Sequence, residues 1–350
     1  MNKYKNIPNN LIYLVGNTLM VEIIYKYKGK ERSVYAKVES FNMTGSIKDR
    51  MQINILRNAY KTKQLKPYDT IVEASSGNTA IALSAMGAYL NHKVSIYMPS
   101  SESMERKELI KSFGAELNLV DEGFDECIRL AKEESKKPNV YYPDQFSNPY
   151  NPQAHFKTTG PEIWQQLISK GKLLNAFVAG VGTGGTIMGT GRYLRTKNPF
   201  LGLFPVQPST SKPFRENGNI YASYDNKERM PVEPMSIPGI STSFTPKIVN
   251  LNELNNAVIV DDSDAYIMAQ RLASELGMGV GPSSGANLIG AIVIQEKLGT
   301  NSVVATVFCD DNKKYLSTEL SKEILFKPTY ISSHVELIAV KSINRICKTK

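Results

Sequence analysis

The chain has 350 residues, of which 41% are hydrophobic and 21% charged, and its net charge is +9 at pH 7. This length and composition predict a well-buried core in two ordinary domains or one large α/β unit, and they argue against wholesale disorder. No signal peptide or long apolar run is seen, so we expect a cytoplasmic protein without a membrane segment. Lysines are spread along the chain, often beside acids, which favours a solvated surface over a nucleic-acid-binding one.

Cysteines and histidines are few and scattered. They are Cys127, Cys309, Cys347, His92, His155 and His334. Without a CxxC pair or a compact histidine group, this set is typical of a reducing compartment and argues against structural zinc, other metals and disulfides. We expect His92, which follows Asn91 in a predicted turn, to be a solvated surface residue.

Short apolar, β-branched runs alternate with longer helical patterns along the chain. Strands are predicted at 70–74, 93–99, 116–120, 176–180, 201–206, 257–260 and 303–308. Helices are predicted at 79–90, 106–113, 124–134, 186–196 and 264–276. This alternation predicts parallel sheets that are covered by helices on both faces.

Two stretches break this rhythm. Residues 208–238 are rich in Pro, Ser, Asn and charge, and a loop of this length is typical of a functional lid or a mobile segment. The tail after Phe326 mixes apolar and basic residues. It is compatible with a final helix packed on the body or with a partner-binding segment, and the sequence does not decide between them.

A glycine-rich turn follows the predicted strand at 176–180. Its residues are Gly182, Thr183, Gly184, Gly185 and Thr186, and a helical pattern begins there. Glycines let several backbone N–H groups converge, and the N-terminus of a helix adds positive potential. The turn therefore predicts a phosphate site.

The same turn also reads as GxGxxG through Gly180, Gly182 and Gly185. A dinucleotide site would need an acidic residue about 20 residues further on, where the next strand ends. That strand ends in Val206-Gln207-Pro208, without a carboxylate. We favour a single phosphate over a dinucleotide, and a purely structural turn is the remaining alternative.

Lys48 lies in Gly45-Ser46-Ile47-Lys48-Asp49-Arg50, a small-residue turn that leads into an amphipathic helix. Residues 51, 55 and 59 of that helix are apolar and share one face. A cation is poorly placed at a helix start. Lys48 is therefore either an exposed surface residue or an amine that is kept neutral or covalently modified.

A run of polar residues follows the predicted strand at 70–74. It comprises Ser75, Ser76, Gly77, Asn78 and Thr79. Backbone N–H groups and hydroxyls at the start of a helix suit a carboxylate ligand. A simple helix cap is the alternative, although a cap needs one such residue rather than five.

Six motifs occur in the order seen in cysteine synthases, the O-acetylserine sulfhydrylases. They are GSIKDR, SSGNT, DQFSNPYNPQAHFKTTGPEIW, GVGTGGT, GPSSGA and KYLST. The resemblance covers residues 10–320. PGI followed by FTP, and FCDDNKKYLST, look more like the B branch of that family, whereas GVGTGGT looks more like the A branch.

The resemblance implies the tryptophan synthase β-like fold of fold-type II pyridoxal-phosphate (PLP) enzymes. This fold has two open, twisted, mostly parallel sheets with helices on both faces. A smaller α/β domain at 49–156 would carry the polar run at 75–79, the asparagine loop, and 1–48 plus 157–326 would form the larger PLP-binding domain. Residues 327–350 would be a C-terminal tail, and the protein would be a homodimer.

The resemblance also implies PLP as cofactor and a role for each matched residue. Lys48 matches the lysine that forms the Schiff base, Asn78 the amide that bonds the PLP 3-hydroxyl, and Ser283 the residue facing the pyridine nitrogen. The substrate carboxylate would be held by Ser75, Ser76, Thr79 and Gln145. The PLP phosphate would be held by Gly182, Thr183, Gly184, Gly185 and Thr186.

The implied reaction is β-replacement, which makes L-cysteine from O-acetyl-L-serine, or another activated serine, and sulfide. In this family the freed lysine removes the Cα proton, the leaving group departs to give an aminoacrylate, and a nucleophile adds. Alternatives with the same chemistry are sulfide release from L-cysteine and replacement by a non-sulfide nucleophile. A catalytically inert binding protein and a nicotinamide dehydrogenase are alternatives from other classes.

One departure from the family concerns the donor. B-type relatives often carry arginines just after PGI, where this chain has Ser241, Thr242 and Ser243. Hydroxyls do not pair with a phosphate as a guanidinium does. O-phosphoserine is therefore disfavoured as donor, unless Lys212 or Arg215 of the long loop takes the place of those arginines.

Overall fold

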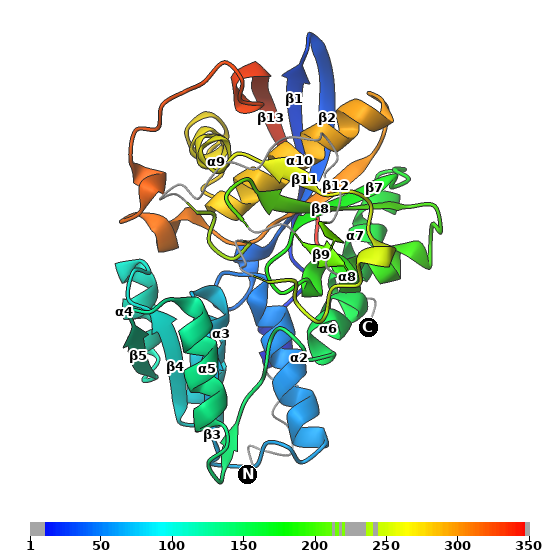
Figure 1. Ribbon diagram of the computed structural model, residues 1–350. Helices are drawn as coiled ribbons and strands as arrows, with labels where there is room; N and C mark the ends of the chain where they lie inside the picture. The colour runs from blue at the N-terminus through cyan, green and yellow to red at the C-terminus, as the bar shows by residue number, and fades with distance from the viewer. Residues whose placement is uncertain (1–10, 212–213, 217–218, 221–235, 241–243, 347–350) are drawn as a thin grey trace.

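The computed structural model describes residues 11–211, 214–216, 219–220, 236–240 and 244–346. The chain forms two sheets with helices around each, and the two bodies lie one above the other (Figure 1). We refer to the seven-stranded sheet and its helices as the large unit. The four-stranded sheet together with helices α2 to α5 is the small unit.

The sheet of the large unit has the order β11-β8-β7-β12-β2-β1-β13. Its strands are β1 (Met20–Tyr27), β2 (Lys30–Val38), β7 (Ala176–Gly180), β8 (Gly202–Pro208), β11 (Val258–Val260), β12 (Val304–Phe308) and β13 (Val335–Ile343). Neighbouring strands from β11 to β2 are parallel, whereas β1 runs antiparallel to both β2 and β13. The sheet is therefore mostly parallel, as predicted.

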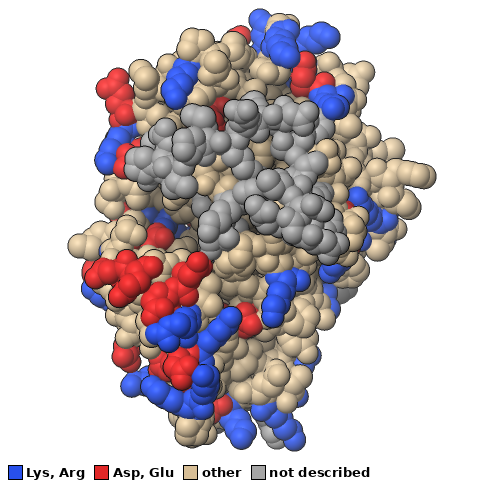
Figure 2. Space-filling model, viewed as in Figure 1, with Lys and Arg blue, Asp and Glu red and all other residues tan. Residues whose placement is uncertain are grey.

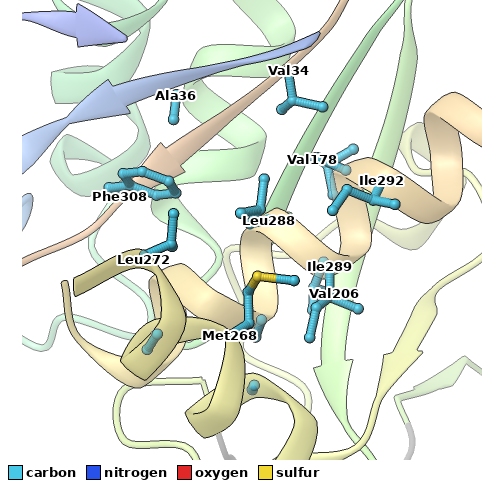
Figure 3. Packing of buried hydrophobic residues seen from close by; sticks show 14 of the residues in the cluster. Val34, Ala36, Val178, Val206, Met268, Leu272, Leu288, Ile289, Ile292 and Phe308 are labelled. Carbon is cyan, nitrogen blue, oxygen red and sulfur yellow. The ribbon is translucent and has the colours of Figure 1, made fainter. Parts of the chain in front are cut away.

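Helices cover both faces of this sheet. On one face lie α9 (Asp262–Leu276) and α10 (Pro282–Leu298), and on the other α7 (Thr159–Ile168) and α8 (Gly185–Arg195), with α6 (Tyr150–Lys157) against α8. Figure 3 shows the core beneath α9 and α10, where Leu288 and Ile292 of α10 lie near Val178 of β7. These side chains are fully buried. Apolar burial of this kind is the main stabilising contribution to the unit.

The sheet of the small unit has the order β5-β4-β3-β6, and all its strands are parallel. They are β3 (Thr70–Ala74), β4 (Val94–Pro99), β5 (Glu116–Val120) and β6 (Val140–Tyr141). Successive residues Ile71 and Val72 belong to different apolar clusters, so both faces of β3 are buried. The helices responsible are α3 (Asn78–Leu90) with α4 (Met104–Ser112) on one side and α5 (Phe124–Glu134) on the other.

Helix α2 (Lys48–Lys61) lies at the boundary between the units, because it packs against α3 of its own small unit and against α6 of the large one. Its predicted apolar face is confirmed, since Met51, Ile55 and Ala59 are fully buried. The remaining elements are short. They are β9 (Arg215–Glu216), β10 (Asn219–Ile220) and the 3-10 helices η2 (Ile12–Leu14), η3 (Glu39–Phe41), η4 (Leu251–Glu253), η5 (Asn312–Tyr315), η6 (Glu319–Ser321) and η7 (Ser332–His334).

The predicted strands and helices are all present, with ends that shift by up to two residues. The tail contains no final helix in its described part. Instead β13 pairs with β1 at the edge of the large sheet. Val335, Leu337 and Ile343 of β13 are buried, and the alternation at its start explains why a short apolar run of this kind becomes a strand.

The prediction for His92 is wrong. His92 is only 7% exposed; its Nδ1 lies 2.7 Å from the carbonyl oxygen of Asp69, and its Nε2 bonds to the hydroxyl of Tyr60. Asn91 has a left-handed backbone, with φ of 58°, and ends α3. This turn directs the next residue beneath the end of α2 rather than into solvent. Burial lowers the pKa of His92.

Lysines and arginines are interspersed with acidic residues on the face that Figure 2 shows. Within the described part of the chain, no helix is both long and apolar enough to cross a membrane. The same residues contain no group of three or more His, Cys, Asp or Glu side chains arranged to hold a metal ion.

Candidate active site

A cleft of about 520 Å³ is lined by residues of both units, a size usual for a small-molecule site. Of the predicted site residues it is lined by Lys48, Ser75, Ser76, Asn78, Thr79, Gln145, Gly182 and Thr183. A smaller cavity shares some of these walls and adds Gly184, Thr186, Ser283 and Cys309. Only Gly185 of the predicted set lines neither cavity, and it is buried at the start of α8.

Lys48 is the first residue of α2, and the backbone that leads into it is anchored. The N–H of Ile47 donates to the carbonyl of Cys309 at 2.9 Å, and the N–H of Lys48 donates to Ser46 Oγ at 3.2 Å. Burial lowers the pKa of Lys48, Lys314 acts in the same direction, and Cys309 and Asp310 oppose it. An amine with a lowered pKa is more readily neutral, as a nucleophile or general base requires.

Four predicted carboxylate ligands lie close together around the start of α3. Thr79 Oγ1 donates to Gln145 Oε1 at 2.7 Å, and Gln145 Nε2 donates to the carbonyl of Ala74 at 2.9 Å. Ser75 helps to cap α3, as the alternative interpretation of this run predicted, because its Oγ accepts the N–H groups of Gly77 and Ala80. Ser76, Thr79 and Gln145 line the cleft beside it.

Glu73 supports this group, and the sequence analysis did not find it. Its carboxyl accepts the N–H of Ala74 at 3.0 Å and the N–H of Gln145 at 3.3 Å. The side chain is fully buried, and burial raises its pKa to about 8. The only signal in the sequence is a glutamate inside an otherwise apolar strand.

The glycine turn packs closely against neighbouring segments of the chain. Gly184 has φ of +84° and precedes α8, a conformation that suits glycine. An added Cβ at Gly182 would overlap the carbonyl oxygen of Gly239, and one at Gly185 would overlap the side chain of Asn151. Thr183 Oγ1 accepts from Asn151 Nδ2 at 3.0 Å and from the N–H of Gly185 at 3.3 Å.

Ser283 lies in the first turn of α10, next to Cys309 in the wall of the smaller cavity. The neighbouring Ser284 Oγ accepts the N–H of Cys309 at 3.0 Å. Burial raises the pKa of the Cys309 thiol to about 11, so the thiol stays protonated near neutral pH. No pattern in the sequence indicates that Cys309 lines this cavity.

Asn78 begins α3 and lines both cavities. Its amide Nδ2 donates to Asp310 Oδ2 at 2.6 Å, and its Oδ1 accepts from Lys314 Nζ at 3.0 Å. Both partners belong to the FCDDNKKYLST motif, for which sequence reasoning gave no role. Of the residues discussed for donor choice, 241–243, Lys212 and the side chain of Arg215 lie outside the described part of the structure.

The donor set fits PLP. An amine of lowered pKa, a glycine turn at a helix N-terminus and a buried serine hydroxyl line one small cavity. These are groups that can bond an aldehyde, a phosphate and a ring nitrogen respectively. The hydroxyls and the amide at 75–79 and 145 line the adjoining cleft, where an amino acid would be bound.

Known proteins are similar to this chain over most of its length. A cysteine synthase of Aquifex aeolicus (strain VF5) is 39% identical over 327 residues, which are 91% of this chain and 93% of that relative. A crystal structure of a hydrogen sulfide-producing enzyme from Fusobacterium nucleatum has a TM-score of 0.87 at 46% identity, and the match covers 96% of this chain and 99% of the other.

A substituted, lysine-dimethylated form of that enzyme, complexed with an α-aminoacrylate intermediate, has a TM-score of 0.88 at 46% identity and covers 99% of this chain and 100% of the other. A cysteine synthase of Entamoeba histolytica has a TM-score of 0.78 at 29% identity, and the match covers 93% of this chain and 95% of the other. Residues 11–310 match the family described as "Pyridoxal-phosphate dependent enzyme". The chain thus belongs to this family of PLP-dependent enzymes.

Proposed function

We propose that the protein catalyses β-replacement on an activated serine, with O-acetyl-L-serine and sulfide as substrates and L-cysteine as product. One observation carries this proposal. The amine of Lys48, the polar loop at 75–79 and the glycine turn at 182–186 line adjoining cavities in a chain 39% identical to a cysteine synthase.

Lys48 would hold PLP covalently and act as the general base. When bound, PLP withdraws electrons from the Cα of the amino acid attached to it. Burial lowers the pKa of Lys48, so that a neutral Nζ is available to accept the Cα proton. Loss of that proton allows the leaving group to depart from Cβ, and sulfide then adds at the same carbon.

The substrate carboxylate would be bound at the start of α3 by the side chains of Ser76 and Gln145 and by the backbone N–H of Thr79, whose hydroxyl already donates to Gln145. The Thr79–Gln145 hydrogen bond of 2.7 Å orients both side chains before substrate arrives, which limits the entropy lost on binding. Ser75 would hold the first turn of α3, because its hydroxyl oxygen accepts two backbone N–H groups, and its own O–H would donate to the carboxylate.

The cofactor itself would be held at three points. The turn of Gly182, Thr183, Gly184, Gly185 and Thr186 would bind its phosphate, Asn78 its 3-hydroxyl, and Ser283 its ring nitrogen. A neutral serine hydroxyl, unlike a carboxylate, does not keep that nitrogen protonated. Such an environment limits carbanion build-up and favours loss of a β-substituent over transamination.

A second candidate is release of hydrogen sulfide from L-cysteine. The observation in its favour is the 46% identity to a hydrogen sulfide-producing enzyme over 96% of this chain. Both reactions use the same residues for the first half, because each begins with proton removal from Cα and loss of a group from Cβ. They differ in which group leaves and which nucleophile adds.

The PLP-loaded enzyme should therefore be incubated with O-acetylserine plus sulfide, with O-phosphoserine plus sulfide, with serine and with cysteine. We expect cysteine formation from O-acetylserine to exceed sulfide release from cysteine at least tenfold in kcat/KM, a difference of about 1.4 kcal/mol in transition-state stabilisation. The opposite ratio establishes the second candidate. A Lys48→Ala variant is the control, and product formation by neither route rejects the proposal.

We further propose two domains, at 49–156 and at 1–48 plus 157–326, in a homodimer in the cytoplasm. The family resemblance supports the two domains and the homodimer, and the separate apolar clusters of the two sheets support the division. The few, scattered cysteines support the cytoplasm. Sedimentation equilibrium should give twice the chain mass of 38.9 kDa, and a monomer would contradict the dimer.

A further inference from the structure

The FCDDNKKYLST segment, residues 308–318, extends from the end of β12 to the small unit. Two of its charged residues, Asp310 and Lys314, are buried with 1% and 4% exposure. Charged side chains are seldom buried without a partner, because removal from water is costly. Both of these residues contact the amide of Asn78, across the boundary between the units.

The chemistry of these partners fixes the orientation of the amide. A lysine ammonium only donates hydrogen bonds and a carboxylate only accepts them. Lys314 Nζ, at 3.0 Å, can therefore pair only with the amide oxygen of Asn78, and Asp310 Oδ2, at 2.6 Å, only with its nitrogen. A flipped Asn78 amide would place its oxygen against the Asp310 carboxylate and its NH2 group against the Lys314 ammonium. One of the two N–H bonds on Nδ2 remains for a ligand.

The two partners are themselves held in place. Lys314 Nζ also donates to the carbonyl of Gly45 at 2.9 Å, in the turn before Lys48. The hydroxyl of Tyr315 donates to Asp310 Oδ2 at 2.5 Å. The guanidinium of Arg106 lies 4.6 Å from the centre of the Tyr315 ring and donates to the carbonyl of Ser76 at 3.1 Å. The network thus contacts the asparagine loop at both Asn78 and Ser76.

We propose that Asp310 and Lys314 are positioning residues that hold the Asn78 amide with its remaining N–H directed at the 3-hydroxyl of PLP. This inference rests on the proposed role of Asn78 in binding the cofactor. It assigns a role to the charged residues of the motif and explains how a side chain of the small unit is kept aligned with a cofactor held mainly by the large unit.

The segment has other contacts that should keep its backbone in place when these side chains change. Ser103 Oγ donates to the carbonyl of Lys314 at 2.9 Å, and the N–H and Oγ of Ser317 both donate to the carboxylate of Glu105 at 2.7 Å. These bonds attach the segment to α4 independently of the Asp310 and Lys314 side chains. Variants at 310 and 314 are therefore expected to fold.

The test is PLP binding by the cofactor-free protein, measured by fluorescence titration and by the visible absorbance of the bound cofactor. Lys314→Met keeps the length of the side chain but removes the donor. This variant should raise the Kd for PLP about tenfold, because about one oriented hydrogen bond is lost. It should also shift the absorbance band of the bound cofactor. Lys313→Met, an exposed neighbour, is the matched control and should leave both unchanged.

A double-mutant cycle separates positioning through Asn78 from a direct effect. In an Asn78→Ala background, Lys314→Met should weaken PLP binding no further. Asp310→Asn should behave in the same way, with a smaller loss of about threefold, because an asparagine oxygen can still accept a bond. Thermal unfolding shows whether each cofactor-free variant has folded. If Lys314→Met does not fold, Asp310→Asn takes its place in the cycle.

The inference would be overturned if Lys314→Met weakened PLP binding equally in the wild-type and Asn78→Ala backgrounds. It would also be overturned if either Lys314→Met or Asn78→Ala alone left the Kd for PLP unchanged. None of these measurements depends on which amino acid the enzyme uses. A protein that makes no cysteine yet shows the expected non-additivity rejects the proposed function alone. A cysteine synthase in which the effects of positions 78 and 314 are additive rejects only the positioning role.

Discussion

Arg50 and Glu162 are 112 residues apart in sequence and form a bidentate pair, with Nη1 to Oε1 at 2.8 Å and Nη2 to Oε2 at 2.7 Å. On its other side Arg50 Nε donates to Glu39 Oε2 at 2.5 Å, and Lys37 Nζ lies 2.9 Å from Glu162 Oε2. All four charges are largely buried. Because Arg50 lies in the first turn of α2, this network fixes the helix start that carries Lys48.

Replacing Arg50 by methionine should destabilise the cofactor-free protein by about 3–5 kcal/mol, because two buried carboxylates lose their main partner. Burial alone would raise the pKa of Glu162, but the charge and hydrogen bonds of Arg50 outweigh it and lower that pKa. Arg50→Lys should also destabilise, since an ammonium cannot replace the bidentate contact. Urea unfolding measures both effects.

The matched control is Arg129→Met, which removes an exposed i,i+3 pair with Glu126. Exposed pairs of this kind contribute little to stability, so we expect no measurable change in the urea midpoint. If Arg50→Met were no more destabilising than Arg129→Met, the buried network would have no structural role.

Much of the fold could be predicted because its strands are short, β-branched and bounded by polar turns, as at 70–74 and 176–180. The elements that were not predicted have residue patterns that do not indicate a helix or strand when each segment is considered alone. Helix α10 is buried on nearly every side, so it shows no polar face and no helical period. The β1–β2 hairpin and β13 form the antiparallel part of the large sheet, which strand–helix alternation does not predict.

The site could be predicted loop by loop, because each loop follows a strand and begins a helix. The carboxyl ends of parallel strands lie at one edge of a sheet, where ligands commonly bind, so loops at 75–79 and 182–186 come to line one cleft. The supporting residues could not be found in this way. Asp310 contacts Asn78 across 232 residues of sequence, and no local pattern indicates such a pairing.

Lys48→Ala should abolish covalent attachment of PLP. Borohydride reduction of the PLP-loaded protein, followed by peptide mass mapping, should place the modified lysine at position 48, because its amine has a lowered pKa and lies in the proposed cofactor cavity. Lys313→Ala, at an exposed position, should leave the labelling unchanged. Modification at another lysine would show that the assignment of Lys48 is wrong.

Gly185→Ala should weaken PLP binding by at least tenfold, about 1.4 kcal/mol, because its Cβ would overlap the Asn151 side chain. Asn151 Nδ2 donates to Thr183 Oγ1 at 3.0 Å, so displacing Asn151 would disturb the glycine turn. Fluorescence titration of the cofactor-free variant with PLP measures the loss.

Gly29→Ala is the control for a general loss of stability, because Gly29 has φ of +75° in the β1–β2 turn and an added Cβ there meets no atom of the described residues within 4 Å. It should lower the thermal midpoint slightly through its positive φ without changing the Kd for PLP. A Gly185→Ala variant that lost stability but kept its PLP affinity would contradict a phosphate role for this turn.

Glu73 should make stability fall as pH rises. Burial raises its pKa from an ordinary value of 4.5 to about 8 in the folded protein. In this window the unfolded chain has released the proton while the folded protein retains it, so ionisation favours unfolding. The contribution is fully present below the ordinary pKa and is lost as pH rises towards 8, with a slope of at most about 1.4 kcal/mol per pH unit.

Glu73→Gln isolates this effect, since glutamine resembles the protonated acid in size and carries no titrating group. The difference in unfolding free energy between wild type and variant, measured with urea from about pH 5 to pH 8, should move steadily in favour of the variant. Gln145, whose N–H donates to Glu73 at 3.3 Å, connects this carboxyl to the proposed carboxylate site. A pH-independent difference would mean that Glu73 is already ionised at pH 5, with its two backbone N–H bonds outweighing burial.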